Sequence, residues 1–397
     1  MKPVIIVVLV DALGWTLAGR DPAFAPALRE RRPLATVLGF SSGALPTAFT
    51  GRSSSEHGRW LMYQRAREHG VFRGFGALRW LPPRVRSSRR LTRLLERWVA
   101  RRGVRGYFNL YEVPREELEW FDLPERDDIF RAGGLPVESL WDALERKRVA
   151  WRGWNWRTPE ATARAQALDE LAAGRLDFLF LYSAVLDARL HHEGSQGAGV
   201  RACVSEWSAW FDAAAAAAAR AGREPWLYLC SDHGMVDVRV TVDVMARVAA
   251  LPFRRGRDYV AFFDSTMARF WWRHPRAREG IRRALEAEPR GRWLSTDELA
   301  REGVAFADAR YGDDVFLLEP GALLLPSFMG RGPVAAMHGY DPAHPDMAGM
   351  LAANRPLPAD VTHLAHLKRF FEREVDAAFG TPGLRTDEAA SRLGAAS

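Results

Sequence analysis

Three acidic residues each follow a short apolar run, and this placement can bring carboxylates from distant parts of the chain together. They are Asp11 after residues 4–10, Asp187 after residues 178–186, and Asp232 after residues 226–230. Uninterrupted apolar runs of this length are typical of strands buried on both faces of a parallel sheet. Ligands of such sheets bind outside the carboxyl ends of the strands, so we expect the three carboxylates to converge at that edge.

Histidines accompany these acids at spacings that suit metal binding. Asp187 and His191 are four residues apart, so a helical turn points both side chains the same way. His233 directly follows Asp232, and His338 lies about a hundred residues later in Met-His-Gly-Tyr-Asp. A lone acid at a strand end is more often a helix cap, and a lone histidine is seldom a ligand. Three carboxylates and three imidazoles together suit zinc, with manganese or iron as alternatives.

A glycine-flanked segment adds hydroxyl groups that could act as nucleophiles. It begins with Gly39-Phe40-Ser41-Ser42-Gly43 and ends at Thr50-Gly51, with Glu56-His57-Gly58 shortly after. Ser41 is expected to open a helix, whose first backbone N–H groups can bind an oxyanion. A metal ion beside a serine lowers the pKa of its hydroxyl and makes it a nucleophile at neutral pH. His57 is interpreted as a structural residue near a helix end.

The elements that must position these residues form an α/β domain. Helical segments at residues 137–148 and 200–220 separate the three apolar runs, and alternating strands and helices indicate a doubly wound, mostly parallel sheet. We expect this catalytic core to comprise residues 1–238 and 331–397. An irregular, Arg- and Trp-rich insertion is expected at about residues 59–131.

Residues 239–330 change character and are expected to form a smaller, inserted α+β cap over the strand ends. Paired strands are predicted at residues 259–263 and 267–272, a helix at 275–288, and a hairpin that joins 314–318 to 322–325 about Pro320-Gly321. Segments 264–267 and 310–313 of this cap could contact a substrate or could equally be turns.

The order of these motifs resembles the nucleotide pyrophosphatase/phosphodiesterase branch of the alkaline phosphatase superfamily. The matching pattern is an early Asp, the glycine-flanked Ser segment, Asp-x-x-x-His-x-x-Gly, Ser-Asp-His-Gly-Met and His-Gly-Tyr-Asp, over residues 4 to about 341. The resemblance implies an alkaline phosphatase-like fold and two divalent metal ions. One would be held by Asp187, His191 and His338, and the other by Asp11, Ser41, Asp232 and His233.

The resemblance also implies an activity. It is metal-dependent hydrolysis of a phosphodiester or pyrophosphate bond through a covalent intermediate on Ser41, with Ser42 as the alternative if the loop shifts by one residue. The substrate would be a small-molecule or polymer-linked phosphate ester. Phosphomonoesterase, phosphonate hydrolase and phosphoryl transferase activities would use the same site. A non-catalytic binding protein would be expected to lose ligands or the nucleophile, and every matched position here is occupied.

One position departs from the family pattern. The phosphodiesterases usually have Asn three residues after the nucleophile, to hold a phosphoryl oxygen, and this chain has Ala44. The Ser42 hydroxyl, the Gly43 N–H group or an arginine could replace that amide. A sulfatase is disfavoured, because its nucleophile is followed by x-Pro-x-Arg and Ser41 is not.

Composition and charge constrain partners and location. The net charge is +7 and the pI about 9.8, but only three residues are lysine, and arginine supplies the rest of the positive charge. Such an arginine bias often reflects a GC-rich genome, so no nucleic-acid partner is predicted. Residues 84–105 could form a basic amphipathic helix that rests on an anionic membrane, although a solvated face is the simpler interpretation. Two cysteines and an apolar start of seven residues without a cleavage site predict a cytoplasmic protein.

Overall fold

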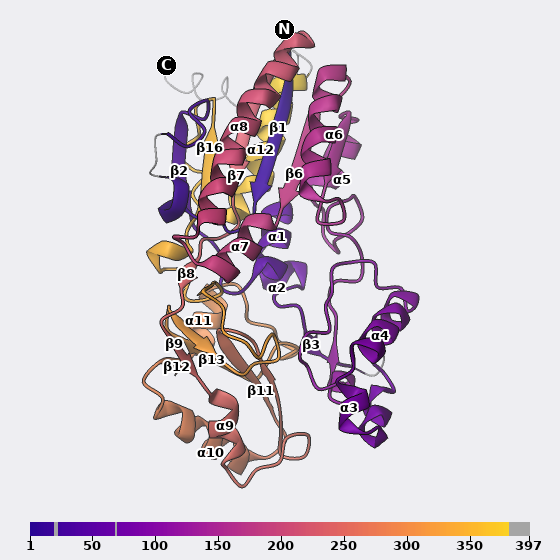
Figure 1. The fold of residues 1–397 in the computed structure, drawn as a ribbon, viewed down its shortest axis with the longest axis vertical. Coiled ribbons are helices and arrows are strands. Elements are labelled where there is room, and N and C mark those ends of the chain that lie inside the picture. Colours follow the sequence, from indigo (N-terminus) through magenta and orange to yellow (C-terminus); the bar gives the residue numbers. More distant parts are fainter. Residues whose placement is uncertain (20–22, 68–69, 381–397) are drawn as a thin grey trace, which may run out of the picture.

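In the computed structural model, which describes residues 1–19, 23–67 and 70–380, a six-stranded sheet forms the centre of the larger part (Figure 1). Its strand order is β2 (Glu30–Leu34), β16 (Gly349–Ala353), β7 (Arg223–Cys230), β1 (Lys2–Val10), β6 (Phe178–Ser183) and β5 (Trp151–Trp154). Strands β7, β1, β6 and β5 run parallel, whereas β16 is antiparallel to both of its neighbours. The predicted α/β fold with a mostly parallel sheet is therefore confirmed.

Helices cover both faces of this sheet because β1 alternates its side chains between two cores. Ile6, Val8 and Val10 pack with α6 (Glu160–Ala173), α7 (Val185–Glu193) and α8 (Ala198–Arg220). Ile5, Val7 and Leu9 pack with α1 (Ser41–Thr50), α5 (Leu140–Arg146) and α12 (Leu367–Phe379). Continuous burial of β1 on two sides explains its unbroken apolar sequence.

A second, antiparallel sheet lies in the lower part of Figure 1 and belongs to residues 259–318. Its order is β10 (Tyr259–Phe263), β11 (Met267–Trp272), β13 (Asp314–Leu318) and β12 (Gly291–Trp293), accompanied by α9 (Val244–Ala249), α10 (Pro275–Glu286) and α11 (Thr296–Arg301). Three two-stranded ladders pair β9 (Val240–Val242) with β14 (Ala322–Leu324), β8 (Val236–Asp237) with β15 (Ala336–Met337), and β3 (Gln64–Arg65) with β4 (Phe121–Asp122).

The predicted hairpin between residues 314–318 and 322–325 is wrong. Strand β13 already pairs with β11 on one edge and β12 on the other, so it has no free edge for β14. Strand β14 instead pairs in parallel with β9. The turn at Gly321 connects the four-stranded sheet to the ladder of β9 and β14, and it does not pair β13 with β14.

Among its described residues, the segment from Arg59 to Arg131 contains β3, β4, α3 (Pro83–Arg86), α4 (Arg89–Arg101) and two short 3₁₀ helices, Phe75–Trp80 and Leu118–Trp120; α2 (Ser54–His57) precedes it. Its apolar residues share one core with the second sheet: Tyr63, Phe72 and Phe121 pack in the same cluster as Phe262 and Phe270. The segment from Arg59 to Arg131 and the second sheet therefore stabilise each other, because each buries apolar side chains against the other.

The sequence indicated that an amphipathic helix at residues 84–105 could contact a membrane. In the structure, helix α4 buries most of the apolar face that would make this contact. Leu95 and Val99 are buried, Leu91 and Trp98 pack against the same core, and only Leu94 of this face is exposed. Among the described residues no helix is both long enough and apolar enough to span a bilayer.

Candidate metal centre

Strand register brings the acidic residues to one edge of the sheet. Val10 pairs with Ser183 of β6, and Leu9 pairs with Cys230 of β7, so the three strands end almost level. Asp11 directly follows β1, and Asp232 lies two residues after the end of β7. The run before Asp187 is part strand and part helix, because β6 ends at Ser183 and Asp187 lies in the first turn of α7.

Asp11, Asp232 and His233 form the first group of converging ligand atoms, all within 4.8 Å of one another. His233 Nε2 lies 3.2 Å from Asp11 Oδ1 and 3.3 Å from Asp232 Oδ2. Its Nδ1 faces the Gly234 carbonyl oxygen at 3.0 Å. Because a carbonyl only accepts, Nδ1 carries a proton, and Nε2 is the ring nitrogen that faces the two carboxylates.

The backbone orients the Asp232 carboxylate within this group. Its Oδ1 accepts the N–H groups of Ala12 at 3.3 Å and His233 at 3.1 Å. The other oxygen, Oδ2, is buried and has no hydrogen-bond partner among the described residues. One oxygen is thus held by N–H donors, and the other is left for a cation.

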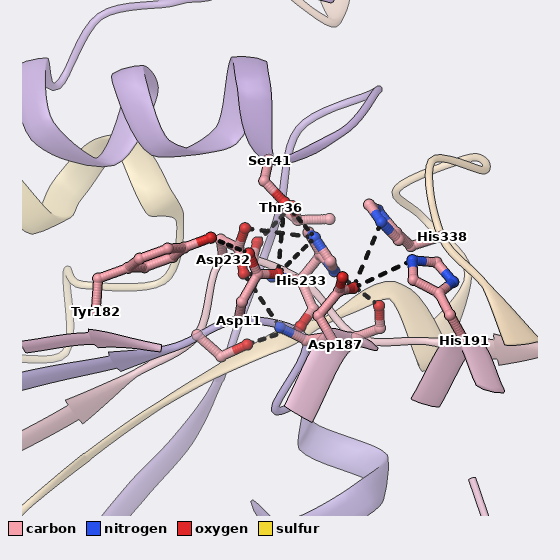
Figure 2. A network of polar contacts seen from close by, with 12 residues as sticks. Asp11, Thr36, Ser41, Tyr182, Asp187, His191, Asp232, His233 and His338 are labelled. Carbon is pink, nitrogen blue, oxygen red and sulfur yellow. Dashed lines mark hydrogen bonds and ion pairs between the residues drawn. The ribbon is translucent and has the colours of Figure 1, made fainter. Parts of the chain in front are cut away.

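Asp187, His233 and His338 form the second group, again within 4.8 Å. Asp187 Oδ1 faces His191 Nε2 at 3.4 Å and His338 Nε2 at 3.6 Å (Figure 2). His191 Nδ1 donates to the Ala336 carbonyl at 2.8 Å, which fixes the tautomer and frees Nε2 as a ligand. The His233 and His338 rings stack with centroids 3.8 Å apart, so His233 joins the two groups.

Ser41 is the first residue of α1 and points into the centre between these groups (Figure 2). Its Oγ lies 3.0 Å from His233 Nε2 and 3.4 Å from Asp11 Oδ1. Ser42 points elsewhere, since its Oγ donates to the Trp60 carbonyl at 3.1 Å. The geometry therefore places Ser41, and not Ser42, beside the ligands.

The turn before Ser41 requires glycine at position 39. Gly39 has φ 120°, and a Cβ there would lie 2.7 Å from Trp60 Nε1, which donates to the Leu38 carbonyl. We expect Gly39→Ala to lower the free energy of unfolding by about 1–3 kcal/mol, through backbone strain and this clash. Urea titration measures the change. Gly332→Ala is the control, because its Cβ would meet nothing within 4 Å, and an equal loss in both variants would contradict the role of Gly39.

Burial, and repulsion between neighbouring carboxylates, disfavour the charged forms of the acidic and histidine side chains at this centre. Burial, then the neighbouring charges of Asp232 and Asp187, raises the pKa of Asp11 well above its usual range. Burial likewise raises the pKa of Asp187 and lowers that of His338, whose Nδ1 has no hydrogen-bond partner among the described residues. A divalent cation would lower the pKa values of the two carboxyl groups again and would further favour the neutral His338 imidazole, because it stabilises carboxylates and binds neutral imidazoles. The donor set and its orphaned oxygens therefore fit metal ions.

Tyr182 supports Asp11 from the side opposite His191 and His338 (Figure 2). Its hydroxyl donates to Asp11 Oδ2 at 2.5 Å, and burial, followed by the Asp11 charge, raises the pKa of Tyr182 well above its usual value. The phenol therefore stays protonated and keeps Asp11 Oδ1 directed at His233. The sequence did not predict this residue, since a tyrosine inside an apolar run gives no motif.

We expect Tyr182→Phe to weaken metal binding by about 10- to 100-fold, the usual effect of removing a hydrogen bond to a metal ligand. Competition for zinc with a chromogenic chelator measures the affinity. Tyr228→Phe is the matched control, because Tyr228 is a buried strand tyrosine that bonds to Glu374, far from the centre. Unchanged zinc affinity in Tyr182→Phe would contradict the supporting role.

A cavity of about 430 Å³ opens onto these residues. Ser41, Asp187, His191 and His338 lie in its wall with apolar and aromatic side chains, among them Phe130 and Trp156. Asp264 and Ser265 also line it, so one of the two predicted cap segments reaches the cavity. Arg310 of the other segment pairs with Asp308 at 2.7 Å.

His57 has the structural role that the sequence suggested. His57 is fully buried at the end of α2, where Nε2 lies 3.0 Å from Thr47 Oγ1 and Nδ1 accepts the Arg59 N–H. Burial lowers its pKa to about 3, which keeps the ring neutral and structural. His192 is exposed and belongs to neither group of ligand atoms.

Comparison with known proteins bears on the fold. No protein-family model matches the chain, and no curated protein matches its sequence. The structure is similar to murine ectonucleotide pyrophosphatase/phosphodiesterase 5, with a TM-score of 0.64, 15% identity and 95% of each chain covered. The human counterpart gives a TM-score of 0.65 at 12% identity over 95% of each chain. An inactive variant of the murine protein in complex with AMP gives 0.63 at 15% identity, over 94% of this chain and 95% of that one. The chain therefore has the alkaline phosphatase-like fold of the nucleotide pyrophosphatase/phosphodiesterases, as the sequence motifs predicted.

Proposed function

We propose that this chain is a metal-dependent phosphoric ester hydrolase that cleaves a phosphodiester or pyrophosphate bond with Ser41 as its nucleophile. The observation that carries the proposal is the position of Ser41 Oγ, 3.0 Å from His233 Nε2 and 3.4 Å from Asp11 Oδ1. A second group of converging ligands lies alongside. The solved structure of a similarly folded protein with AMP supports a phosphate ester as the substrate class.

Two metal ions are proposed. Asp11, Asp232, His233 and Ser41 would hold one, and Asp187, His191 and His338 the other. Bound there, they would activate a hydroxyl or water and stabilise charge on the attacking and leaving oxygens. Zinc is proposed on the mixed carboxylate and imidazole set, with manganese or iron as alternatives, and elemental analysis of the purified protein identifies the metal.

The protein's own groups carry the two chemical steps. Ser41 Oγ loses its proton and attacks phosphorus, so a P–O bond to Ser41 forms as the bond to the leaving group breaks, and the leaving oxygen takes up a proton to depart as an alcohol or phosphate. Water then attacks the phosphoseryl group from the opposite side, and Ser41 Oγ leaves. The N-terminus of α1 bears partial positive charge, which favours the phosphoryl group throughout.

Ala44 is the residue that favours phosphomonoesterase activity as the alternative function. The residue is buried in α1 and offers no side-chain donor to a phosphoryl oxygen. The test is the ratio of turnover on an aryl phosphodiester to turnover on the matching aryl monoester, with zinc or manganese bound. A ratio above one, lost on chelation and restored by metal, supports the proposal. A ratio below one makes the protein a phosphatase, and metal-independent turnover would remove the two-metal mechanism.

A cytoplasmic location stays a prediction, and cell fractionation tests it. Membrane attachment through residues 84–105 stays a secondary proposal. Co-sedimentation with anionic vesicles tests it, and Arg89 and Arg93 of α4 are the residues to replace.

A further inference from the structure

A groove of about 920 Å³ is lined by helices α3 and α4 and by the loops at residues 109–116 and 329–331. Helices α3 and α4 lie at one outer edge of the molecule (Figure 1). The groove wall contains six arginines and three glutamates, an excess of three positive charges. These residues are Arg84, Arg86, Arg89, Arg93, Arg115 and Arg331, with Glu96, Glu112 and Glu116. A hollow lined by charge of one sign attracts ligands of the opposite sign.

Protein carboxylates pair with only some of these arginines. Arg86 pairs with Glu116, and Arg331 pairs with Glu112 at 3.0 Å. The exposed arginines whose side chains make no hydrogen bond or ion pair with the described chain are Arg84, Arg89 and Arg93. Two of them lie four residues apart on α4, so their side chains share one face of that helix. The groove therefore offers guanidinium groups that no protein acid occupies.

The groove adjoins the cavity beside Ser41. Tyr111 and Met329 line both hollows, and both side chains are half-buried. The cavity itself measures about 430 Å³. A substrate too long for the cavity can extend past these two side chains and reach the arginines.

Two other anionic partners fit the groove less well. A flat membrane surface does not fill a hollow, and the apolar face of α4 is committed to the protein core through Leu95 and Val99. Single-stranded nucleic acids bind on aromatic side chains that stack with successive bases. Tyr111 is the one aromatic residue among the described residues that line the groove.

We propose that this arginine groove binds the anionic chain of a polymeric substrate, so that the natural substrates are chains of phosphate-linked alcohol units, one of whose diesters enters the cavity at Ser41. The inference rests on the proposed function. Guanidinium groups suit this task, because their fork of donors makes charge-assisted hydrogen bonds with phosphate oxygens.

Two synthetic substrates of different length test the groove. The short one is 4-nitrophenyl 3-hydroxypropyl phosphate, and the long one continues the hydroxypropyl group into a chain of about eight propanediol phosphates. We expect the protein to prefer the long substrate. Replacing Arg89 and Arg93 together with glutamine should lower kcat/KM for it about 10- to 100-fold, the usual effect of losing one or two charge-assisted hydrogen bonds. The short substrate should lose only about twofold, through weaker attraction of its single charge.

Arg90 and Arg97 provide the matched control. Both are exposed on α4, and neither lines the groove, so replacing both with glutamine removes the same charge from the same helix. This variant should lose no more than about twofold on either substrate. Equal losses in the two double variants would overturn the inference, because net charge and not the groove would then attract the chain. Equal kcat/KM for the long and short substrates in the unmodified protein would overturn it as well.

A binding measurement keeps the inference separate from the proposed hydrolysis. Fluorescence anisotropy follows a labelled chain of about eight propanediol phosphates on the metal-loaded Ser41→Ala protein. A DNA strand of equal charge and phosphatidylserine vesicles serve as competitors. We expect the propanediol chain to bind, and the slope of log Kd against log salt concentration to fall by about 1.4 when Arg89 and Arg93 are replaced, since each phosphate contact contributes about 0.7.

The outcomes separate the two claims. An unchanged salt slope after replacement of Arg89 and Arg93, or binding of DNA or vesicles but not of the propanediol chain, would refute the groove as the site of a phosphate-linked chain even if hydrolysis were confirmed. Tight binding that these two replacements weaken would support the groove, and absence of hydrolysis would then contradict only the proposed function.

Discussion

Replacing Ser41 with alanine is expected to lower kcat/KM for an aryl phosphodiester by roughly 10³- to 10⁶-fold, the scale seen when a covalent nucleophile is removed. The Ser41 Oγ atom lies 3.4 Å from Asp11 Oδ1 and 3.0 Å from His233 Nε2. Alanine preserves the helix start, because the first turn of α1 is held by backbone bonds from Gly43 and Ala44 to Phe40. Steady-state kinetics with saturating metal measure the loss, and the melting temperature should change little.

Ser42→Ala is the matched control for this experiment. It removes a neighbouring hydroxyl that bonds to the Trp60 carbonyl and not to the proposed ligands. Only a small loss of activity is expected. If Ser42→Ala were the inactive variant and Ser41→Ala the active one, the nucleophile assignment would be wrong.

Asp232→Asn is expected to remove one of two bound metal ions and to lower kcat by at least about 10²-fold, since the reaction then lacks one of the two charges that stabilise its oxygens. The substitution keeps Oδ1, which accepts the N–H groups of Ala12 and His233. It replaces the orphaned Oδ2 with a neutral amide that repels a cation. Elemental analysis gives the metal content and kinetics the rate.

Asp169→Asn provides the comparison, because Asp169 is an exposed carboxylate on α6. It should keep both metal ions and full activity. Two tightly bound ions in Asp232→Asn would show that Asp232 is not a ligand, whatever the activity.

Local sequence pattern was enough to predict the residues that converge at the sheet edge. The runs before Asp11 and Asp232 are apolar because β1 and β7 are neighbouring strands that are buried on both faces. Spacing placed Asp187 and His191 on one face of a helix, and both lie in α7. These features depend on neighbours in sequence, which a single chain reveals directly.

Features that depend on distant contacts were predicted less well. The strand at residues 322–324 was assigned to its nearest neighbour in sequence, but the available edge belonged to β9. The packing of the 59–131 segment on the second sheet was not predicted, because Tyr63 and Phe121 reach the core of that sheet from far away in the sequence. Tyr182 was not singled out, because what distinguishes it is a hydrogen-bond partner in space.

The stereochemical course at phosphorus tests the covalent mechanism most directly. A diester made chiral at phosphorus with sulfur and oxygen isotopes would be hydrolysed by the metal-loaded protein and the product configuration determined. Attack by Ser41 and then by water gives two in-line displacements, each of which inverts phosphorus, so net retention is predicted. Net inversion would mean that water attacks the substrate directly, and Ser41 would then be a metal ligand without a covalent role.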